Sequence, residues 1–172
     1  MKIVTDIKQI EKLAAEKEVQ NWRFRCFLKG CGLEVEELDA IVHKLYYAVS
    51  AKIDCQTCGH CCRVIHPILN KKDIKRLASH LSMPASEFEN TYLVRDEEGD
   101  ELTFRYTPCP FLSGNSCTVY SARPEDCRSY PHLHKDGFVF RTIGVFSNCS
   151  VCPIVYNVYE LLKDEFHSRG LW

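Results

Sequence analysis

Apolar residues recur at helical spacing through the first third of the chain and predict two helices there. Asp6 followed by Gln9 resembles a capping box at the start of the first helix, and Gly30 suits its end. The apolar residues that support this helix are Ile7, Ile10, Leu13, Ala14, Trp22, Phe24, Phe27 and Leu28. The second helix is expected over residues 34–52, and its inward face is formed by Leu38, Ile41, Val42, Leu45 and Val49.

Three later segments are also expected to be helical. Asn70 can cap a helix over residues 71–81, and a shorter helix fits residues 85–93. Pro153 suits the first position of a C-terminal helix over residues 153–170. The core face of this last helix would hold Ile154, Val158, Leu161 and Leu162.

Between the helices the pattern changes to alternation and turns. Leu102, Phe104 and Tyr106 alternate with polar residues, as in a half-buried strand. The run Lys135-Asp136-Gly137-Phe138 is typical of a hairpin turn, and residues 138–146 resemble a strand. The sequence therefore predicts an α+β fold, with helices at both ends and a small antiparallel β region between cysteine-bearing loops.

Length and composition are those of an ordinary globular domain. The chain has 172 residues, of which 45% are apolar and 26% are charged, and this balance argues against intrinsic disorder. We expect a single domain over residues 1–172. It would consist of a helical lead-in (1–52), a metal-binding core (53–152) and the C-terminal helix (153–170).

Charge and hydropathy limit the partners. The formal net charge is −1 and no basic stripe is present, so neither a nucleic-acid partner nor a membrane surface is predicted. No stretch approaches the roughly 18 apolar residues of a membrane span. Residues 1–29 carry many charges and no apolar run typical of a signal peptide. We therefore expect a cytoplasmic protein.

The cysteines are the main indication of chemistry. Four of the eleven lie within eight residues, in the run Cys55-Gln56-Thr57-Cys58-Gly59-His60-Cys61-Cys62. In the cytosol thiols are kept reduced, so clustered cysteines are more often metal ligands than disulfides. Thiolates at CxxC spacing select zinc, iron in clusters or cuprous copper. The candidate metal ligands are Cys55, Cys58, Cys61, Cys62, Cys109, Cys117, Cys127, Cys149 and Cys152.

Two kinds of centre fit these cysteines. Cys55, Cys58 and Cys61 have the CxxCxxC spacing that wraps an iron–sulfur cluster, with a fourth ligand from one of two Cys-Pro steps. Alternatively, the first two of these cysteines and the later CxxC pair at residues 149–152 would close a four-thiolate zinc site. The expected cofactor is therefore an iron–sulfur cluster, of the [4Fe–4S] type, or Zn²⁺.

A second centre is also possible, because adjacent cysteines rarely bind the same small ion. Cys61 and Cys62 are therefore expected to serve different roles. The second centre would be formed by Cys62, Cys109, Cys117 and Cys127. Cys26 and Cys31 are interpreted as structural.

Charged and ionisable residues lie beside these cysteines. Arginines near several thiolates would offset their negative charge and lower the pKa values of the thiols. The arginines in question are Arg63, Arg123 and Arg128. The histidines, which are weaker candidates for ligands, are His60, His66, His132 and His134.

The order of motifs resembles a known family. Residues 53–63, Ile-Asp-Cys-Gln-Thr-Cys-Gly-His-Cys-Cys-Arg, resemble the signature of the YkgJ-type cysteine-cluster proteins, the CxxCxxCC family. The segments at residues 109–112, 117–120 and 123–131 follow in the family's order, and the resemblance covers residues 50–152. It implies a domain that chelates zinc or iron, in a family whose members mostly have no assigned activity. The ligands that it implies are Cys55, Cys58, Cys61, Cys62, Cys109, Cys117 and Cys127.

The sequence thus predicts a cytosolic protein that holds an iron–sulfur cluster or zinc through cysteine thiolates. No catalytic triad or acid–base pair is evident. Two alternatives stay open. One is a redox or protein-modifying enzyme, for which Cys62 is the first candidate as a reactive thiol. The other is a structural zinc module that presents a surface to a protein partner.

Overall fold

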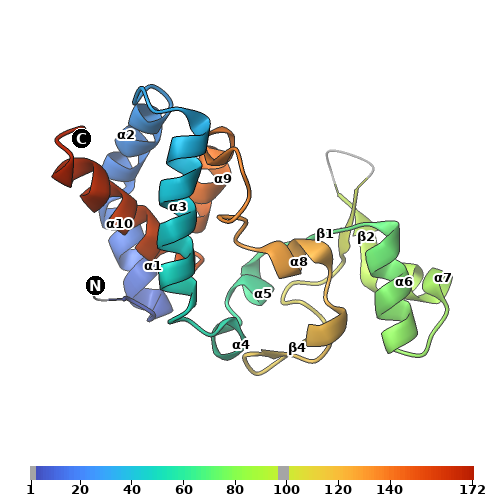
Figure 1. The fold of residues 1–172 in the computed structure, drawn as a ribbon. Coiled ribbons are helices and arrows are strands. Elements are labelled where there is room, and N and C mark those ends of the chain that lie inside the picture. The colour runs from blue at the N-terminus through green and yellow to red at the C-terminus, as the bar shows by residue number, and fades with distance from the viewer. Residues whose placement is uncertain (1–2, 97–100) are drawn as a thin grey trace. The chain divides into compact units, whose positions relative to one another are not determined.

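The computed structural model describes residues 3–96 and 101–172, which form two compact units (Figure 1). Unit 1 combines residues 1–54 with residues 131–172, and unit 2 comprises residues 55–130. Helices stand at both ends of the chain and short antiparallel strands lie between them, so the α+β class is confirmed. The organisation as a single domain stays a prediction. Among the helices that the structure describes, none combines the length and apolar character needed to cross a bilayer.

Unit 1 is a helical assembly in which the C-terminal helix is central. Its helices are α1 (Ile7–Glu16), α2 (Glu18–Leu28), α3 (Val35–Ser50), η2 (Phe138–Arg141), α9 (Thr142–Asn148) and α10 (Pro153–Ser168). Helix α10 begins with Pro153 at its first turn, as predicted, and packs against α1, α3 and α9. Its buried Tyr159 and Phe166 contact Phe24 of α2 edge-on, with ring centroids 5.4 and 5.9 Å apart. Apolar burial therefore joins the first and last segments of the chain.

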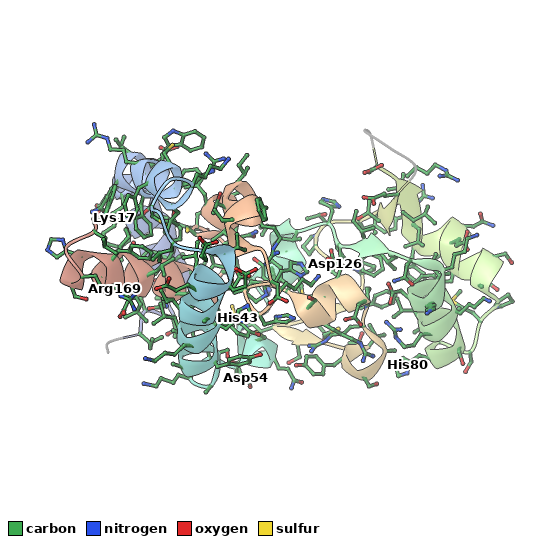
Figure 2. The ribbon with its side chains drawn as sticks, turned by 45° about the horizontal axis from the view of Figure 1, so that its top comes forward. Lys17, His43, Asp54, His80, Asp126 and Arg169 are labelled. Carbon is green, nitrogen blue, oxygen red and sulfur yellow. The ribbon has the colours of Figure 1, made fainter. Side chains whose placement is uncertain are left out.

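The helix expected to run from Asp6 to Gly30 is two helices, which corrects the prediction. The N-terminal cap is as expected, because the Asp6 carboxylate accepts a hydrogen bond of 2.7 Å from the Gln9 amide. At Lys17 the backbone leaves helical geometry, with φ −100° and ψ 9° (Figure 2). The Lys17 ammonium pairs with Glu160 of α10. The break redirects the chain so that α1 packs on α10 and α2 packs on α9.

The hairpin and strand predicted over residues 135–146 are wrong, because residues 138–146 are helical. The buried Asp39 carboxylate accepts hydrogen bonds from the amides of Gly137 and Phe138, at 2.6 and 2.9 Å, and so caps η2. The buried residues then recur at helical spacing, at Phe138, Thr142, Val145 and Cys149. A capping carboxylate nearly one hundred residues away thus outweighs the local preference of the β-branched residues.

Unit 2 combines short helices with two small antiparallel sheets. Its helices are α4 (Cys55–Cys58), α5 (Cys61–Val64), α6 (Lys71–His80), α7 (Ala85–Tyr92), η1 (Tyr120–Ala122) and α8 (Glu125–Ser129). Its strands are β1 (Ile68–Leu69), β2 (Leu93–Arg95), β3 (Leu102–Phe104), β4 (Leu112–Ser113) and β5 (Ser116–Cys117). One sheet has the order β1-β3-β2 and the other is the β4–β5 hairpin, in which Leu112 pairs with Cys117. The cap predicted at Asn70 is confirmed and is part of a capping box, because Asn70 and Asp73 bond each other's backbone amides.

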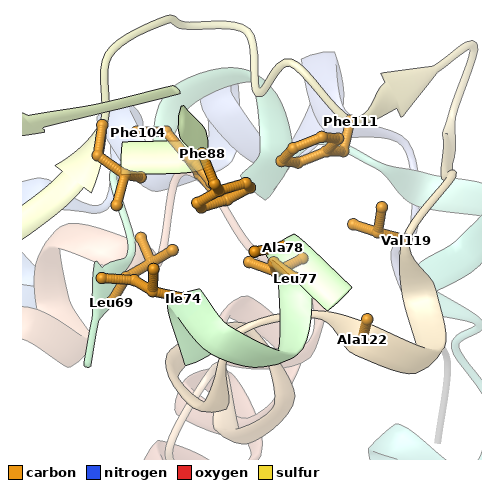
Figure 3. Packing of buried hydrophobic residues seen from close by; sticks show 10 residues of the cluster. Leu69, Ile74, Leu77, Ala78, Phe88, Phe104, Phe111, Val119 and Ala122 are labelled. Carbon is orange, nitrogen blue, oxygen red and sulfur yellow. The ribbon is translucent and has the colours of Figure 1, made fainter. Parts of the chain in front are cut away.

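The apolar core of unit 2 lies between α6, α7 and the strands (Figure 3). Its buried members are Leu69, Ile74, Leu77, Ala78, Phe88, Leu93, Phe104, Phe111, Val119 and Ala122. Phe111 contacts both Phe88 and Phe104, with ring centroids 6.2 and 5.5 Å apart. Cys109 and Cys117 pack against this core. The core therefore fixes the segment that carries these two cysteines.

Candidate metal centre

The four-cysteine run folds as two single helical turns, α4 and α5, joined through Gly59. Gly59 has φ +58°, in the left-handed region that favours glycine. It also lies so close to the β4–β5 turn that a Cβ would stand 2.5 Å from the backbone oxygen of Asn115. Glycine is therefore needed here both for the turn and for the close approach of two backbones.

The β4–β5 segment brings two more cysteines to this loop. The amide of Cys109 donates a hydrogen bond of 2.7 Å to the carbonyl of Cys62. The amide of Thr118 donates to the carbonyl of Phe111 at 2.9 Å and closes the hairpin that carries Cys117. Backbone hydrogen bonds thus position the segments that bear Cys62, Cys109 and Cys117.

Cys127 lies on α8, which acidic residues orient. The Asp73 side chain is 1% exposed, and its carboxylate accepts a hydrogen bond of 3.0 Å from the Glu125 amide at the start of α8. The Asp126 carboxylate accepts a hydrogen bond of 3.1 Å from the Ile68 amide in β1 (Figure 2). These contacts tie α8 to α6 and β1.

Four thiols lie on these segments, Cys62, Cys109, Cys117 and Cys127, and the charge of Cys62 affects the ionisation of the other three. Burial raises the pKa of Cys109 to about 11, and the charges of Cys62 and Cys117 add to this rise. Burial raises the pKa of Cys127 to about 12, with further contributions from the other three thiols. Burial, and the charge of Cys62, also raise the pKa of Cys117. Cys109, Cys117 and Cys127 therefore resist ionisation unless a cation is bound.

Cys62 differs from the other three members. A hydrogen bond with the Cys61 thiol, followed by the charges of Arg63 and Arg123, lowers the pKa of Cys62 to about 7. The guanidinium of Arg123 stacks 3.7 Å from the centroid of the Tyr120 ring. Cys62 is therefore the thiol of this set that ionises near neutral pH.

The four thiols lie near one another, but they do not surround a common point at the distances that metal ligands require. Across residues 3–96 and 101–172, no three His, Cys, Asp or Glu side chains are arranged so that they could hold a metal ion as they stand. The side chains must therefore move before the four thiols can share an ion. The donor chemistry fits zinc or iron, since both prefer thiolate sulfur.

The other predicted ligands lie in both units. In unit 2, Cys55 is exposed, whereas Cys58 and Cys61 are half-buried. In unit 1, Cys149 and Cys152 are buried where α9 ends and α10 begins. The Cys149 thiol donates to a backbone oxygen one turn earlier at 3.5 Å, and burial raises the pKa of Cys149 well above its ordinary value. The part that these five cysteines play in metal binding stays a prediction.

The remaining cysteines and histidines lie outside the four-thiol set. Cys26 is exposed, so it does not have the packing role expected of it, and Cys31 is half-buried with its thiol 3.4 Å from the carbonyl oxygen of Leu28. His66 Nε2 shares a hydrogen bond of 2.8 Å with Thr107 Oγ1. No disulfide bond joins cysteines within the described part of the chain.

Two residues that support the site escaped the sequence analysis. Asp73 completes the cap of its own helix and also holds the start of α8. Asn115 receives a hydrogen bond from Arg63 at the β4–β5 turn. The Ser113-Gly114-Asn115 turn was visible in the sequence, but nothing local indicates which segment it would contact.

The metal-free protein is expected to lose stability as the pH rises from about 9 to about 11. In the unfolded chain a thiol ionises near pH 8.5, whereas the folded pKa values of Cys109 and Cys127 are about 11 and about 12. Between these limits the folded state keeps protons that the unfolded chain has released, so the free energy of unfolding falls. Cys62 has the opposite effect, because its contribution to the free energy of unfolding is lost as the pH falls through about 7.

Denaturant midpoints at about pH 8.5 and about pH 10.5 measure this effect. The protein is kept anaerobic, with a reductant and a chelator. A variant with alanine at positions 109 and 127 is the control, and its midpoint should fall less over the same interval. An equal fall in both proteins would show that these two thiols do not carry the pH dependence.

Comparison with known proteins gives the family. Residues 54–152 match the family CxxCxxCC, described as "Putative zinc- or iron-chelating domain". An uncharacterized protein of Methanocaldococcus jannaschii is 35% identical over 82 residues, which are 45% of this chain and 43% of that protein. The chain thus aligns with less than half the length of this curated relative. No solved structure matches the chain significantly. Because the match spans more than half of the chain and includes the whole four-cysteine run, the chain belongs to the CxxCxxCC family of zinc- or iron-chelating domains.

Proposed function

We propose that unit 2 is a metal-binding module that holds zinc or iron through the thiolates of Cys62, Cys109, Cys117 and Cys127. One observation carries the proposal: separate segments supply these four thiols, and the charge of Cys62 raises the pKa values of Cys109, Cys117 and Cys127. Cys109 and Cys117 also pack against the core of unit 2, but packing does not require four neighbouring thiols, and thiolate sulfur suits both metals. Membership of a zinc- or iron-chelating family supports the same conclusion.

The charges around the set favour a bound cation. Burial holds Cys109, Cys117 and Cys127 in their protonated forms, so metal binding would release their protons. Four thiolates around one divalent ion leave a net charge of about −2. The guanidinium groups of Arg63 and Arg123, which already lower the pKa of Cys62, would offset this charge.

We further propose that Cys55, Cys58 and Cys61 serve a second centre, an iron–sulfur cluster of the [4Fe–4S] type. Their CxxCxxC spacing supports this, because one loop can then supply three ligands to one cluster. Because both centres require reduced thiols, we propose that the protein acts in the cytoplasm.

Anaerobic purification followed by elemental analysis and absorption spectroscopy tests the proposal. We expect a metal content of at least one zinc ion or one iron cluster per chain. Brown protein that bleaches in air would identify an iron–sulfur cluster, and colourless protein with stoichiometric zinc would identify zinc.

Two serine variants separate the proposed centres. Cys117→Ser should remove the metal of the four-thiol set, whereas Cys58→Ser should remove only that of the CxxCxxC loop. A wild-type protein that retains neither metal would overturn the proposed function. Unchanged metal content in Cys117→Ser would overturn the assignment of the four-thiol set.

A further inference from the structure

Arg63 joins the four-cysteine loop to the β4–β5 turn. It follows Cys62 directly on α5 and is half-buried. Its Nη1 donates a hydrogen bond of 2.8 Å to the carbonyl of Gly59 in its own loop. Its Nη2 donates to the carbonyl of Gly114 at 2.6 Å and to the side-chain oxygen of Asn115 at 2.9 Å. One guanidinium thus bonds both segments at once.

Other contacts close the same junction. The Ser116 hydroxyl donates to the carbonyl of Gln56 at 3.2 Å, and α4 packs against β5. Gly59 allows the two backbones to approach, because any Cβ there would meet the backbone of Asn115. The loop that carries Cys62 and the hairpin that carries Cys117 are therefore held together by contacts with backbone atoms, and these contacts involve neither thiol.

The geometry of these contacts requires arginine. A guanidinium presents donors in a planar fork and can bond acceptors on two sides, whereas the ammonium of lysine is a compact charge on a flexible stem. A lysine at position 63 would keep the positive charge near Cys62 but could not bond all three acceptors in this arrangement. Charge and positioning can therefore be separated by experiment.

We propose that Arg63 is the positioning residue of the metal centre: it fastens the four-cysteine loop to the β4–β5 turn and fixes the spacing of Cys62 and Cys117 before metal binds. This inference rests on the proposed function. It assigns to Arg63 a role in preorganisation, since residues that hold ligand-bearing segments commonly change metal affinity without touching the metal.

The test compares Arg63→Lys and Arg63→Ala with Arg105→Ala in the full-length protein. Arg105 is a matched control, because its guanidinium also bonds backbone carbonyls in unit 2, those of Asn90 and Leu93 at 3.3 and 2.7 Å. Affinity for Zn²⁺ is measured by competition with a chromophoric chelator. The absorption of bound Co²⁺ reports the geometry of the thiolates. Hydrogen exchange of the backbone amides is measured in the metal-free proteins over residues 55–64 and 112–117.

Both Arg63 variants should bind Zn²⁺ about 10- to 100-fold more weakly and alter the Co²⁺ spectrum. The rate of hydrogen exchange in both Arg63 variants should rise together in residues 55–64 and 112–117. Arg105→Ala should lower stability and leave affinity, spectrum and exchange of these segments unchanged. Wild-type Zn²⁺ affinity in Arg63→Lys would overturn the positioning role. If Arg63→Ala then binds Zn²⁺ more weakly, Arg63 acts through its charge. If Arg63→Ala also binds normally, Arg63 has no effect on metal affinity. If wild-type protein binds neither Zn²⁺ nor Co²⁺ and retains no iron after anaerobic purification, the proposed function fails and the positioning role fails with it. If it retains iron alone, iron content replaces Zn²⁺ affinity in the same comparison. Raised hydrogen exchange in the Arg63 variants would in either case show that Arg63 holds the four-cysteine loop against the β4–β5 turn.

Discussion

Replacing Gly59 with alanine is expected to destabilise the protein by about 2–4 kcal/mol and to reduce its metal content. The left-handed φ of +58° is unfavourable for any residue with a Cβ. The new Cβ would also stand 2.5 Å from the backbone oxygen of Asn115 and 2.9 Å from its Cα, so the α4–α5 loop must move away from the hairpin. Urea denaturation of the metal-free protein and elemental analysis of the purified protein measure the two effects.

Gly114→Ala is the matched control for this prediction. Gly114 has nearly the same backbone conformation, with φ +59°, but nothing lies within 4 Å of the position of its Cβ. Gly114→Ala should therefore lose only about 1 kcal/mol of stability, which is the cost of the left-handed backbone conformation without a steric clash. Its metal content should stay normal. Equal losses in the two variants would show that the contact with Asn115 has no energetic consequence.

Replacing Cys127 with serine is expected to weaken zinc or iron binding by at least about 100-fold, because one of four thiolate ligands is lost. Cys127 lies on α8, which Asp73 and Asp126 tie to the rest of unit 2, so no other thiol can readily take its position. A hydroxyl is also a poor substitute for thiolate sulfur toward either metal. The measurement is metal retention after dialysis against a chelator of known affinity.

Cys26→Ser is the control, because Cys26 is exposed on α2 of unit 1. It should keep full metal content, and its stability should stay within about 0.5 kcal/mol of the wild type. Cys127→Ala serves as a second variant, since it leaves no buried hydroxyl and so separates loss of a ligand from loss of folding. Normal metal retention in both Cys127 variants would remove this residue from the proposed centre.

The contacts that support the four-thiol set share one feature: they hold the backbone of the ligand-bearing segments. Arg63 bonds the carbonyls of Gly59 and Gly114, and Asp73 bonds an amide at the start of α8. The Arg128 guanidinium bonds the carbonyl of Arg123 at 3.0 Å just before the same helix. This arrangement fixes the segments and leaves the short thiol side chains able to turn toward an ion.

Features that depend on a few neighbouring residues could be predicted from the sequence. The caps at Asp6 and Asn70 and the first-turn position of Pro153 are confirmed, because a cap needs only a side-chain acceptor or a fixed φ at the right offset. The strand predicted from Leu102, Phe104 and Tyr106 is confirmed at its first two residues. Tyr106 lies beyond β3 and is exposed, and Thr103 is buried beside Phe104, so the expected alternation is not observed. The family resemblance is also confirmed over most of the predicted range.

Predictions failed where a distant contact decided the local structure. Residues 138–146 have strand-like composition, but Asp39 caps a helical turn there. The break at Lys17 has no glycine or proline to announce it, and it allows α1 and α2 to pack on different partners. In both cases packing and capping by remote residues exceed an intrinsic preference worth only tenths of a kcal/mol per residue.

For the candidate site, the order of residues along the chain indicated the candidate donors, which are thiols at ligand spacing in the order typical of the family. It left open how those thiols divide, because spacing along the chain constrains only residues within one loop. The tertiary structure decided that Cys62 neighbours Cys109, Cys117 and Cys127. It also decided that Gly59, Arg63 and Asp73 hold their segments. The physical reason is that the core of unit 2 and its backbone hydrogen bonds, acting between residues up to about sixty positions apart, set which loops meet.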